Sequence, residues 1–304
     1  MPNFARPIAA AGLAALTLSA AAACGSSSSG GSGSTVSPQA SSPSGVNSAA
    51  VALLPAPVKA KGTLVVAADA TYAPNEFVGN DGKTIEGMDA DLAEAIGKAL
   101  GLKVTLTNET FDGIIPGIAA GKYDVGMSSF TDTKEREQTV DFVDYFQAGT
   151  SFFEKAEGGP TVTGLDGLCG LKVAVEKGTT QQDDATAQSK KCTKAGKAAV
   201  TVDTFPDQNG ANLALQSGHD QVGMADSPVA AYQVKKSDGQ FKLVGTAYGV
   251  APYGIALPKG TGLTQAVKTA VQGLIDDGSY LTILDKWGVE SGAIKTATVN
   301  QAIS

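Results

Sequence analysis

Histidine is almost absent from this chain, and so are the usual catalytic motifs. The 304 residues include one histidine, His219, and no G-x-S-x-G, H-E-x-x-H or P-loop motif. A Ser–His triad or a histidine-bound metal would have to use His219, which we predict to lie in a surface turn. The 30 acidic residues leave carboxylate-based catalysis open. We expect no catalytic residue, no bound metal and no cofactor.

A basic surface is also missing. The net charge is −7, and the pairs Lys190-Lys191 and Lys235-Lys236 are isolated and predicted to be solvated. A nucleic-acid-binding protein needs a basic face that releases counterions from the phosphate backbone. The composition therefore argues against a nucleic acid as partner.

No hydrophobic run at the N-terminus is long enough to span a membrane comfortably. The Ala-rich run from Ile8 to Ala23 follows Arg6 and ends in small residues before Cys24, which is the order of a signal peptide. We expect residues 1–23 to be removed. Ser19 to Cys24 resembles a bacterial lipobox and predicts a lipid on Cys24, although Ala21 stands where that pattern has Leu or Val. The alternative is ordinary secretion, with Cys24 as a spare thiol.

The segment after Cys24 has few residues that can be buried. Its sequence, GSSSSGGSGSTVSPQASSPSG, is rich in Ser, Gly and Pro, and this composition is typical of a flexible tether. We predict a tether over residues 24–60 and a folded part that starts near Lys61.

Cysteine is scarce as well, with three residues in the chain. If Cys24 carries a lipid, Cys169 and Cys192 remain. The export signal implies an oxidising compartment, so we expect these two to form a disulfide. Closing such a loop contributes about 3 kcal/mol in the chain-entropy model. The alternative of a metal site is disfavoured, because no nearby histidine or second cysteine pair completes a ligand set.

Two similar series of strands and helices follow the tether. Apolar runs predict strands at 63–69, 102–108, 171–178 and 199–204. Apolar spacing predicts a helix at 88–101, where Asp89 or Asp91 would cap the start. A second helix is predicted at 179–191. Segments 110–127 and 204–224 align, both end in Val-Gly-Met, and each predicts helix, turn and strand. Repeated strand–helix–strand units indicate two α/β lobes with mostly parallel sheets flanked by helices, and a ligand at the strands' carboxyl ends.

Arginine is the rarest cation, and Arg136 is the one that remains after the signal peptide. Its planar fork grips a carboxylate through two hydrogen bonds, whereas lysine is a point charge. Arg136 lies on a short helix predicted for 133–140, next to the carboxyl end of a strand. These features favour an anion site. The alternative is a surface pair with a neighbouring glutamate.

Residues 62 to about 290 resemble the family 3 extracellular solute-binding proteins, the polar amino-acid receptors of ABC importers. The matching stretches, in order, are DATYAPNEF, GMDADLAEAIG, FDGIIPGIAAGKYDVGMSSFTDTKERE, VDF, VEKGTT, ADSPVAAY, PYGIALPKG and DKWG. The resemblance implies a type II periplasmic-binding-protein-like fold. Lobe 1 would take 61–153 plus 250–304, and lobe 2 would take 154–249, with two strand crossings as the hinge.

The resemblance also implies roles for matched residues. Arg136 and the backbone amide of Thr131 would hold an α-carboxylate, while Ser129 and Asp226 would take the α-amine. The remaining expected contacts are Thr180 and Gln181 from lobe 2, the aromatic walls Tyr72 and Phe111, and Asp69 at the ligand side chain. Each has a plainer alternative: a helix N-cap for Asp226, and core packing for the two aromatics.

Three neighbouring positions bear on the identity of the ligand. Glu76 either joins Asp69 in favouring a basic side chain or is solvated surface. Asn75 stands where the family often has Phe, so we expect that wall of the pocket to be more polar. Phe130 stands where an aliphatic residue is expected.

The resemblance implies a function without a chemical step. We expect an extracytoplasmic, lipid-anchored monomer that binds a free amino acid, polar or basic, and delivers it to a membrane permease. The alternative is a cleft-based carboxylate enzyme of the same fold, similar to cyclohexadienyl dehydratases.

Overall fold

The computed structural model describes residues 45–303. The signal peptide predicted for 1–23 and the predicted lipidation at Cys24 lie outside these residues. Among the residues described, no helix is both long and apolar enough to cross a membrane.

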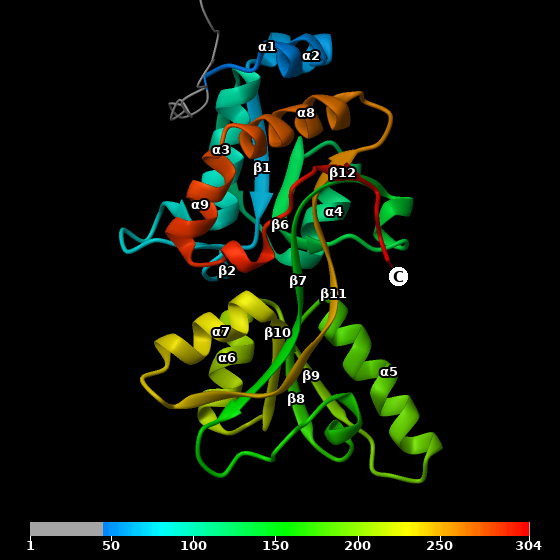
Figure 1. Cartoon of the computed structure of the whole chain (residues 1–304). Helices are drawn as coiled ribbons and strands as arrows, with labels where there is room; N and C mark the ends of the chain where they lie inside the picture. The colour runs from blue at the N-terminus through cyan, green and yellow to red at the C-terminus, as the bar shows by residue number, and fades with distance from the viewer. Residues whose placement is uncertain (1–44, 304) are drawn as a thin grey trace, which may run out of the picture. The chain divides into compact units, whose positions relative to one another are not determined.

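The first lobe is built on parallel strands (Figure 1). β5 (Lys103–Asn108), β1 (Thr63–Ala68) and β6 (Val125–Thr131) run parallel, and β11 (Phe241–Pro258) pairs antiparallel with β6. The helices of this lobe are α1 (Ser48–Ala52), α2 (Ala56–Lys61), α3 (Met88–Leu100), α4 (Phe111–Ala119), α8 (Leu263–Asp276) and α9 (Ser279–Trp287). Smaller elements are β2 (Thr71–Tyr72), β3 (Glu76–Val78), β4 (Ile85–Glu86), η1 (Arg136–Gln138), η3 (Glu290–Gly292) and β12 (Thr298–Val299).

Helices cover both faces of this sheet because its strands are apolar on both faces. In β1, Leu64 and Val66 belong to the core shared with α3, α8 and α9, whereas Val65 and Ala67 pack with α4 on the other face. The helix α3 begins after Gly87 without a side-chain cap, so the predicted caps are wrong, and it ends at Gly101, where φ is +67°.

The second lobe repeats this plan. β9 (Thr201–Phe205), β8 (Lys172–Glu176) and β10 (Val222–Asp226) run parallel, and β7 (Val140–Lys155) pairs antiparallel with β10. α5 (Thr180–Lys194) lies on one face of this sheet, and α6 (Gln208–Ser217) and α7 (Ser227–Lys236) lie on the other. η2 (Leu165–Leu168) precedes β8. The predicted α/β class with mostly parallel sheets is confirmed.

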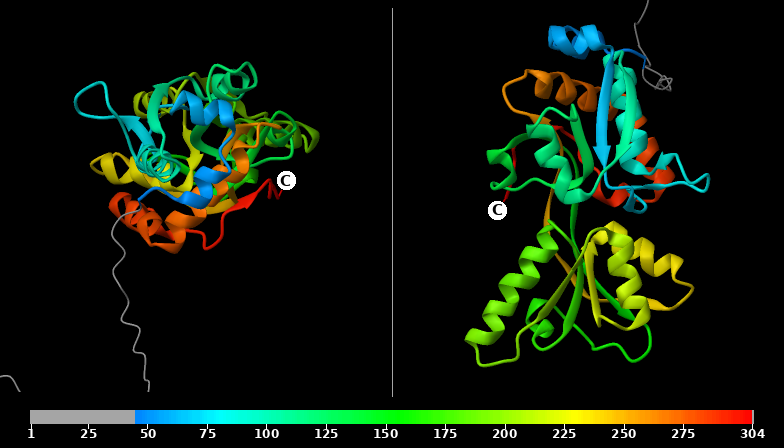
Figure 2. Two further views of the ribbon diagram at one scale, coloured as in Figure 1. Left: turned by 90° about the horizontal axis from the view of Figure 1, so that it is seen from above. Right: turned by 180° about the vertical axis from the view of Figure 1, so that it is seen from behind.

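Two long strands, β7 and β11, run through both lobes and join their sheets (Figure 1). They pair antiparallel, and their register shifts between Val244 and Tyr248 and again between Tyr248 and Ala251. Gly249 has φ +63° in this stretch, a conformation that glycine adopts without steric cost. Figure 2 shows that the blue to blue-green segments and the orange to red segments gather in one lobe, and that the green-to-yellow segments form most of the other.

The predicted tether extends too far toward the C-terminus. Residues 48–52 and 56–61 form α1 and α2, and α1 packs against α3 and α8. Ala50 and Leu54 are buried in the lobe 1 core, and the Asn47 side chain caps α1 by accepting from the Ala50 amide at 3.1 Å. The run AAVALLPAPV thus belongs to the folded part, because its apolar side chains find a surface on distant helices.

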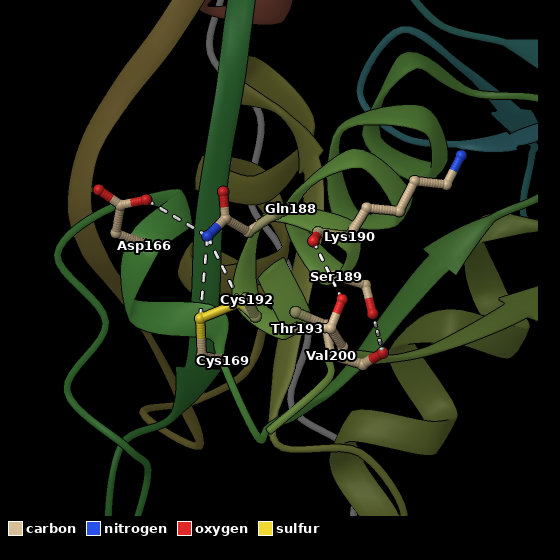
Figure 3. Close-up of a disulfide and its surroundings, with 8 residues drawn as sticks. All are labelled: Asp166, Cys169, Gln188, Ser189, Lys190, Cys192, Thr193 and Val200. Carbon is tan, nitrogen blue, oxygen red and sulfur yellow. Dashed lines mark hydrogen bonds between the residues drawn. A yellow bond between two sulfur atoms is a disulfide. The ribbon is translucent and has the colours of Figure 1, made fainter. Parts of the chain in front are cut away.

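Lobe 2 contains the disulfide that was predicted from the cysteine count. Cys169, after η2, is bonded to Cys192 in the last turn of α5, with the Cα atoms 5.6 Å apart. Figure 3 shows Gln188 above the two sulfurs, with its amide nitrogen directed at them and at Asp166. Cys192 is 1% exposed, so the bond lies within the lobe 2 core.

Candidate functional site: a charged cleft between the two lobes

Residues from both lobes meet at one small pocket. Eight of the nine predicted binding residues line it: Asp69, Tyr72, Phe111, Ser129, Thr131, Thr180, Gln181 and Asp226. The ninth, Arg136, lines an adjoining cavity of about 840 Å³ that shares Thr131, Thr180 and Asp226 with the pocket. The structure therefore brings all nine residues together.

The topology explains this convergence. In lobe 1, Asp69 follows β1 and Thr131 ends β6; in lobe 2, Glu176 ends β8 and Asp226 ends β10. All four positions are at the carboxyl ends of parallel strands, which is where ligands bind in open α/β sheets. The two sets of strand ends face each other across the boundary between the lobes.

Arg136 is held by main-chain groups and an aromatic ring. Its Nη1 donates to the carbonyl oxygen of Thr131 at 2.8 Å, and its Nη2 donates to that of Gly178 in lobe 2 at 2.9 Å. Its guanidinium carbon lies 5.3 Å from the centre of the Phe111 ring, close enough for a cation–π contact. Thr131 thus contacts Arg136 through its carbonyl, and the predicted contact of its amide with a ligand carboxylate stays a prediction.

The short helix that carries Arg136 is smaller than predicted. It is the single turn η1 at residues 136–138, in place of a helix over 133–140. The neighbouring Glu137 pairs with Lys134 at 2.9 Å. Among the residues described, no carboxylate forms an ion pair with Arg136, so the alternative of a pair with a neighbouring glutamate is wrong. The negative charges of Asp226, Asp183 and Glu135 act on Arg136 without forming an ion pair with it.

Asp226 supplies the opposite charge from lobe 2. It is 6% exposed, and its Oδ1 accepts from Gln181 Nε2 at 2.8 Å. Its backbone amide donates to the Tyr72 hydroxyl of lobe 1 at 3.0 Å. Burial raises the pKa of Asp226, and the positive charge of Arg136 works in the opposite direction. Asp226 is the N-cap residue of α7, as the alternative predicted, but its side chain makes no capping hydrogen bond.

The two aromatic residues pack and line the pocket at once. Tyr72 belongs to a buried cluster with Phe153 and Val229, and its hydroxyl reaches across to lobe 2. Phe111 stacks on Phe130, with ring centres 4.6 Å apart. Phe130 itself is 1% exposed and does not line the pocket.

A pair of carboxyl groups lies at the pocket, one from each lobe. Asp69 accepts from Thr71 Oγ1 at 2.6 Å and from the Phe111 amide at 3.1 Å. Glu176 is 2% exposed, and its Oε1 has no hydrogen-bond partner among the residues described. Burial, followed by the negative charge of Asp69, holds the pKa of Glu176 well above its usual value. Burial also raises the pKa of Asp69.

A second pair of acids lies beneath the pocket. Ser129 has φ +51°, unusual for a residue with a side chain, and its amide donates to Asp89 Oδ2 at 2.8 Å. Glu76 is fully buried and accepts from Ser128 Oγ at 2.8 Å. Burial raises the pKa of Glu76 well above its usual value and that of Asp89 to about 6. Neither acid lines the pocket; both hold the segment that does.

These contacts correct two expectations. Glu76 is neither solvated nor at the pocket wall. It is buried, and it accepts hydrogen bonds from the hydroxyls of Ser128 and Ser129. Asn75 is fully buried and donates to Ser129 Oγ at 2.8 Å, so it does not make the pocket wall more polar. The hydroxyl of Ser129 is therefore already engaged with protein groups.

Sequence reasoning missed Glu176, although a signal was present. The apolar run VAV ends in this acid, at the carboxyl end of a predicted parallel strand. An acid at such a position is a candidate for ligand contact by the same strand-end argument that was applied to Arg136.

Comparison with known families settles the class of protein. The model of the bacterial extracellular solute-binding proteins, family 3, matches residues 64–290. The chain belongs to this family. The resemblance predicted from the sequence motifs is confirmed, and the family description places its members outside the cytoplasm.

Individual relatives agree with this assignment. The arginine-binding protein ArgT of Corynebacterium glutamicum is 35% identical to the family 3 chain over 251 residues, which cover 82% of each protein. An ancestral arginine-binding protein solved with arginine is 38% identical, with a TM-score of 0.68 over 74% of this chain and 98% of that one. An ancestral amino-acid-binding protein described as a precursor of cyclohexadienyl dehydratase is 34% identical, with a TM-score of 0.68 over 76% of this chain and 97% of that one.

Proposed function

We propose that this chain is an extracytoplasmic receptor that binds a free amino acid between its lobes and delivers it to the permease of an ABC importer. The observation that carries the proposal is the meeting of Arg136 and Asp226 at adjoining cavities. A free amino acid is a zwitterion. The arginine fork suits its carboxylate, and the buried Asp226 carboxylate suits its ammonium.

Contacts between the lobes support a closing motion. The Asp226 amide meets the Tyr72 hydroxyl, and the Gln208 amide donates to Thr71 Oγ1 at 3.2 Å. A ligand that touches both lobes favours the arrangement in which they are close. We propose that lobe 1 comprises residues 61–153 and 250–304 together with α1 and α2, and that lobe 2 comprises residues 154–249. We expect the permease to bind the closed form.

The acids Asp69 and Glu176 favour a ligand with a cationic side chain, such as arginine or lysine. A cation between the two carboxyl groups would allow both to ionise, and its donors would occupy Glu176 Oε1, which has no partner among the described residues. The rings of Phe111 and Tyr72 offer apolar walls for the aliphatic part. That ArgT and the ancestral protein bind arginine, as their names state, adds support.

Thermal unfolding against the twenty amino acids and several sugars tests the receptor proposal. A ligand at about 100 times its Kd adds about 2.7 kcal/mol of stability. That raises the unfolding midpoint by several degrees, at about 2–4 °C per kcal/mol for a protein of this size. We expect basic amino acids to give the largest shift and Arg136→Ala to abolish it. Shifts with sugars alone, or unchanged shifts in Arg136→Ala, would contradict the proposal.

An enzymatic function is the second candidate, and one observation favours it. The raised pKa of the pocket acid Glu176 suits a general acid, and one structural neighbour is described as the precursor of a dehydratase. We propose that the chain performs no such reaction. Incubation with prephenate or arogenate should give no aromatic product, and formation of one that Glu176→Gln abolishes would establish the enzyme instead.

We further propose that the protein is a monomer anchored by a lipid on Cys24 after removal of residues 1–23. Detergent phase partition of the exported protein tests this. The wild type should enter the detergent phase and Cys24→Ser the aqueous phase. Equal partition of the two proteins would favour ordinary secretion.

A further inference from the structure

Lobe 2 carries a cluster of side chains with metal-binding chemistry, apart from the pocket. Asp203 lies on β9, and His219 and Asp220 lie in the turn between α6 and β10. One possible ligand atom from each residue lies within 4.8 Å of the others. His219 Nε2 and Asp203 Oδ2 are 3.6 Å apart. The cluster brings an imidazole and two carboxylates together.

Asp220 is the buried carboxylate of this cluster, and it lacks hydrogen-bond donors. It is 2% exposed, and neither of its carboxylate oxygens has a hydrogen-bond partner within residues 45–303. The adjacent Asp203 carboxyl repels it, and the weaker attraction of His219 and Lys172 comes without a hydrogen bond. A buried carboxylate without donors is costly unless a cation or a hydrogen bond compensates it.

The turn that presents Asp220 is fixed by its backbone. The amides of His219 and Asp220 both donate to the carbonyl of Ala214, at 2.9 and 3.2 Å. The next residue, Gln221, is tied to Lys172 on β8 by its amide and its side chain. The direction of the Asp220 side chain is thus set by the fold, and it faces Asp203 and His219.

We propose that Asp203, His219 and Asp220 bind a divalent transition-metal cation, with Zn²⁺ as the best fit. Zn²⁺ accepts imidazole nitrogen and carboxylate oxygen at about 2.0–2.2 Å, with water in an open fourth position. A tetrahedron of that size places ligand atoms about 3.3 Å apart. The 3.6 Å between His219 and Asp203 needs only a small contraction, and the other pairs of ligand atoms, which lie within 4.8 Å, need to close by at most about 1.5 Å. The His219 side chain is 60% exposed, so the ion has access from solvent.

The position of the cluster predicts what the metal would do. The turn at His219 and Asp220 precedes β10, whereas the pocket lies at the opposite, carboxyl end of that strand. A bound ion would tie the α6–β10 turn to β9. It would stabilise lobe 2 and leave amino-acid binding unchanged.

Calorimetric titration of the purified, EDTA-stripped protein with Zn²⁺ tests the proposal. We expect one ion per chain, a rise in the thermal midpoint, and at least tenfold weaker binding in His219→Gln and in Asp220→Asn. His219→Gln alters an exposed side chain, so its fold should be intact. Glu157→Gln removes an exposed lobe 2 acid and should bind as the wild type does.

Co²⁺ provides a spectroscopic check on the same variants. Its visible absorption reports coordination by nitrogen and oxygen ligands, and we expect a band in the wild type that His219→Gln removes. Zn²⁺ binding that His219→Gln leaves unchanged, or the absence of any one-to-one binding, would overturn the proposal.

Discussion

Replacing Glu176 with glutamine separates a receptor for cationic side chains from one for neutral side chains. Glu176 ends β8 at the pocket, opposite Asp69, and its Oε1 has no partner among the residues described. Glu176→Gln keeps the shape of the side chain and removes its ability to ionise. A guanidinium or ammonium group would lose a charged partner, and a neutral amide would not.

The size of the effect follows from one charge-assisted hydrogen bond. Such a bond contributes about 1.5–3 kcal/mol. Its loss should weaken arginine binding by about 10- to 150-fold, since about 1.4 kcal/mol is tenfold in Kd. Binding of glutamine should change little, so the ratio of the two affinities is the decisive quantity.

Calorimetry at two pH values provides the assay. Burial raises the pKa of Glu176 well above its usual value, and a cation beside the carboxyl group lowers that pKa, so binding of a cationic ligand should release protons. Arginine should therefore bind more tightly to the wild type as the pH rises, and should release protons that buffers of different ionisation heat reveal. Both effects should shrink in Glu176→Gln and persist in Glu157→Gln. Equal losses for arginine and glutamine in Glu176→Gln would refute the reasoning.

Three further predictions concern the clamp, the buried acids and the disulfide. Arg136→Lys should weaken ligand binding at least tenfold in calorimetry, because an ammonium cannot hold a carboxylate with a planar fork; unchanged affinity would contradict the clamp. Burial raises the pKa of Asp89 to about 6, and burial together with the nearby Asp144 raises the pKa of Asp132, the buried residue that follows β6, to about 8. The folded state therefore binds more protons than the unfolded state, so stability falls as the pH rises from about 4 toward 8. The unfolding midpoint should be higher at pH 5.5 than at pH 8, and the opposite order would contradict this. Replacing Cys169 and Cys192 with serine should cost about 3 kcal/mol in urea unfolding, and a loss below about 1 kcal/mol would show that the cross-link contributes little.

Much of the fold could be predicted because its signals are local. The apolar runs at 63–69 and 171–178 mark buried strands, and the two segments ending in Val-Gly-Met show that a strand–helix–strand plan recurs. Arg136 was found because arginine is rare here and because it follows a strand. Each of these features can be read within a short window of sequence.

The features that were missed depend on distant contacts. α1 and α2 were assigned to the tether, because the apolar face of residues 48–61 gains a partner only when α3 and α8 pack beside it. Glu176 meets Asp69 only when the two lobes face each other. Glu76 accepts hydrogen bonds from Ser128 and Ser129 only when β3 lies close to β6 in the fold. Its neighbours in sequence therefore could not reveal these contacts.

Recognition of both α-groups of a free amino acid is the central claim, and titration with truncated ligands tests it most directly. Agmatine is arginine without its carboxylate, and 5-guanidinopentanoate is arginine without its amine. In calorimetry we predict that arginine binds and that each analogue binds at least tenfold more weakly, because agmatine leaves Arg136 without its anion and 5-guanidinopentanoate leaves Asp226 without its cation. If either analogue binds as tightly as arginine, the group it lacks is not recognised, and the assignment of Arg136 and Asp226 to the two ends of a zwitterion is wrong.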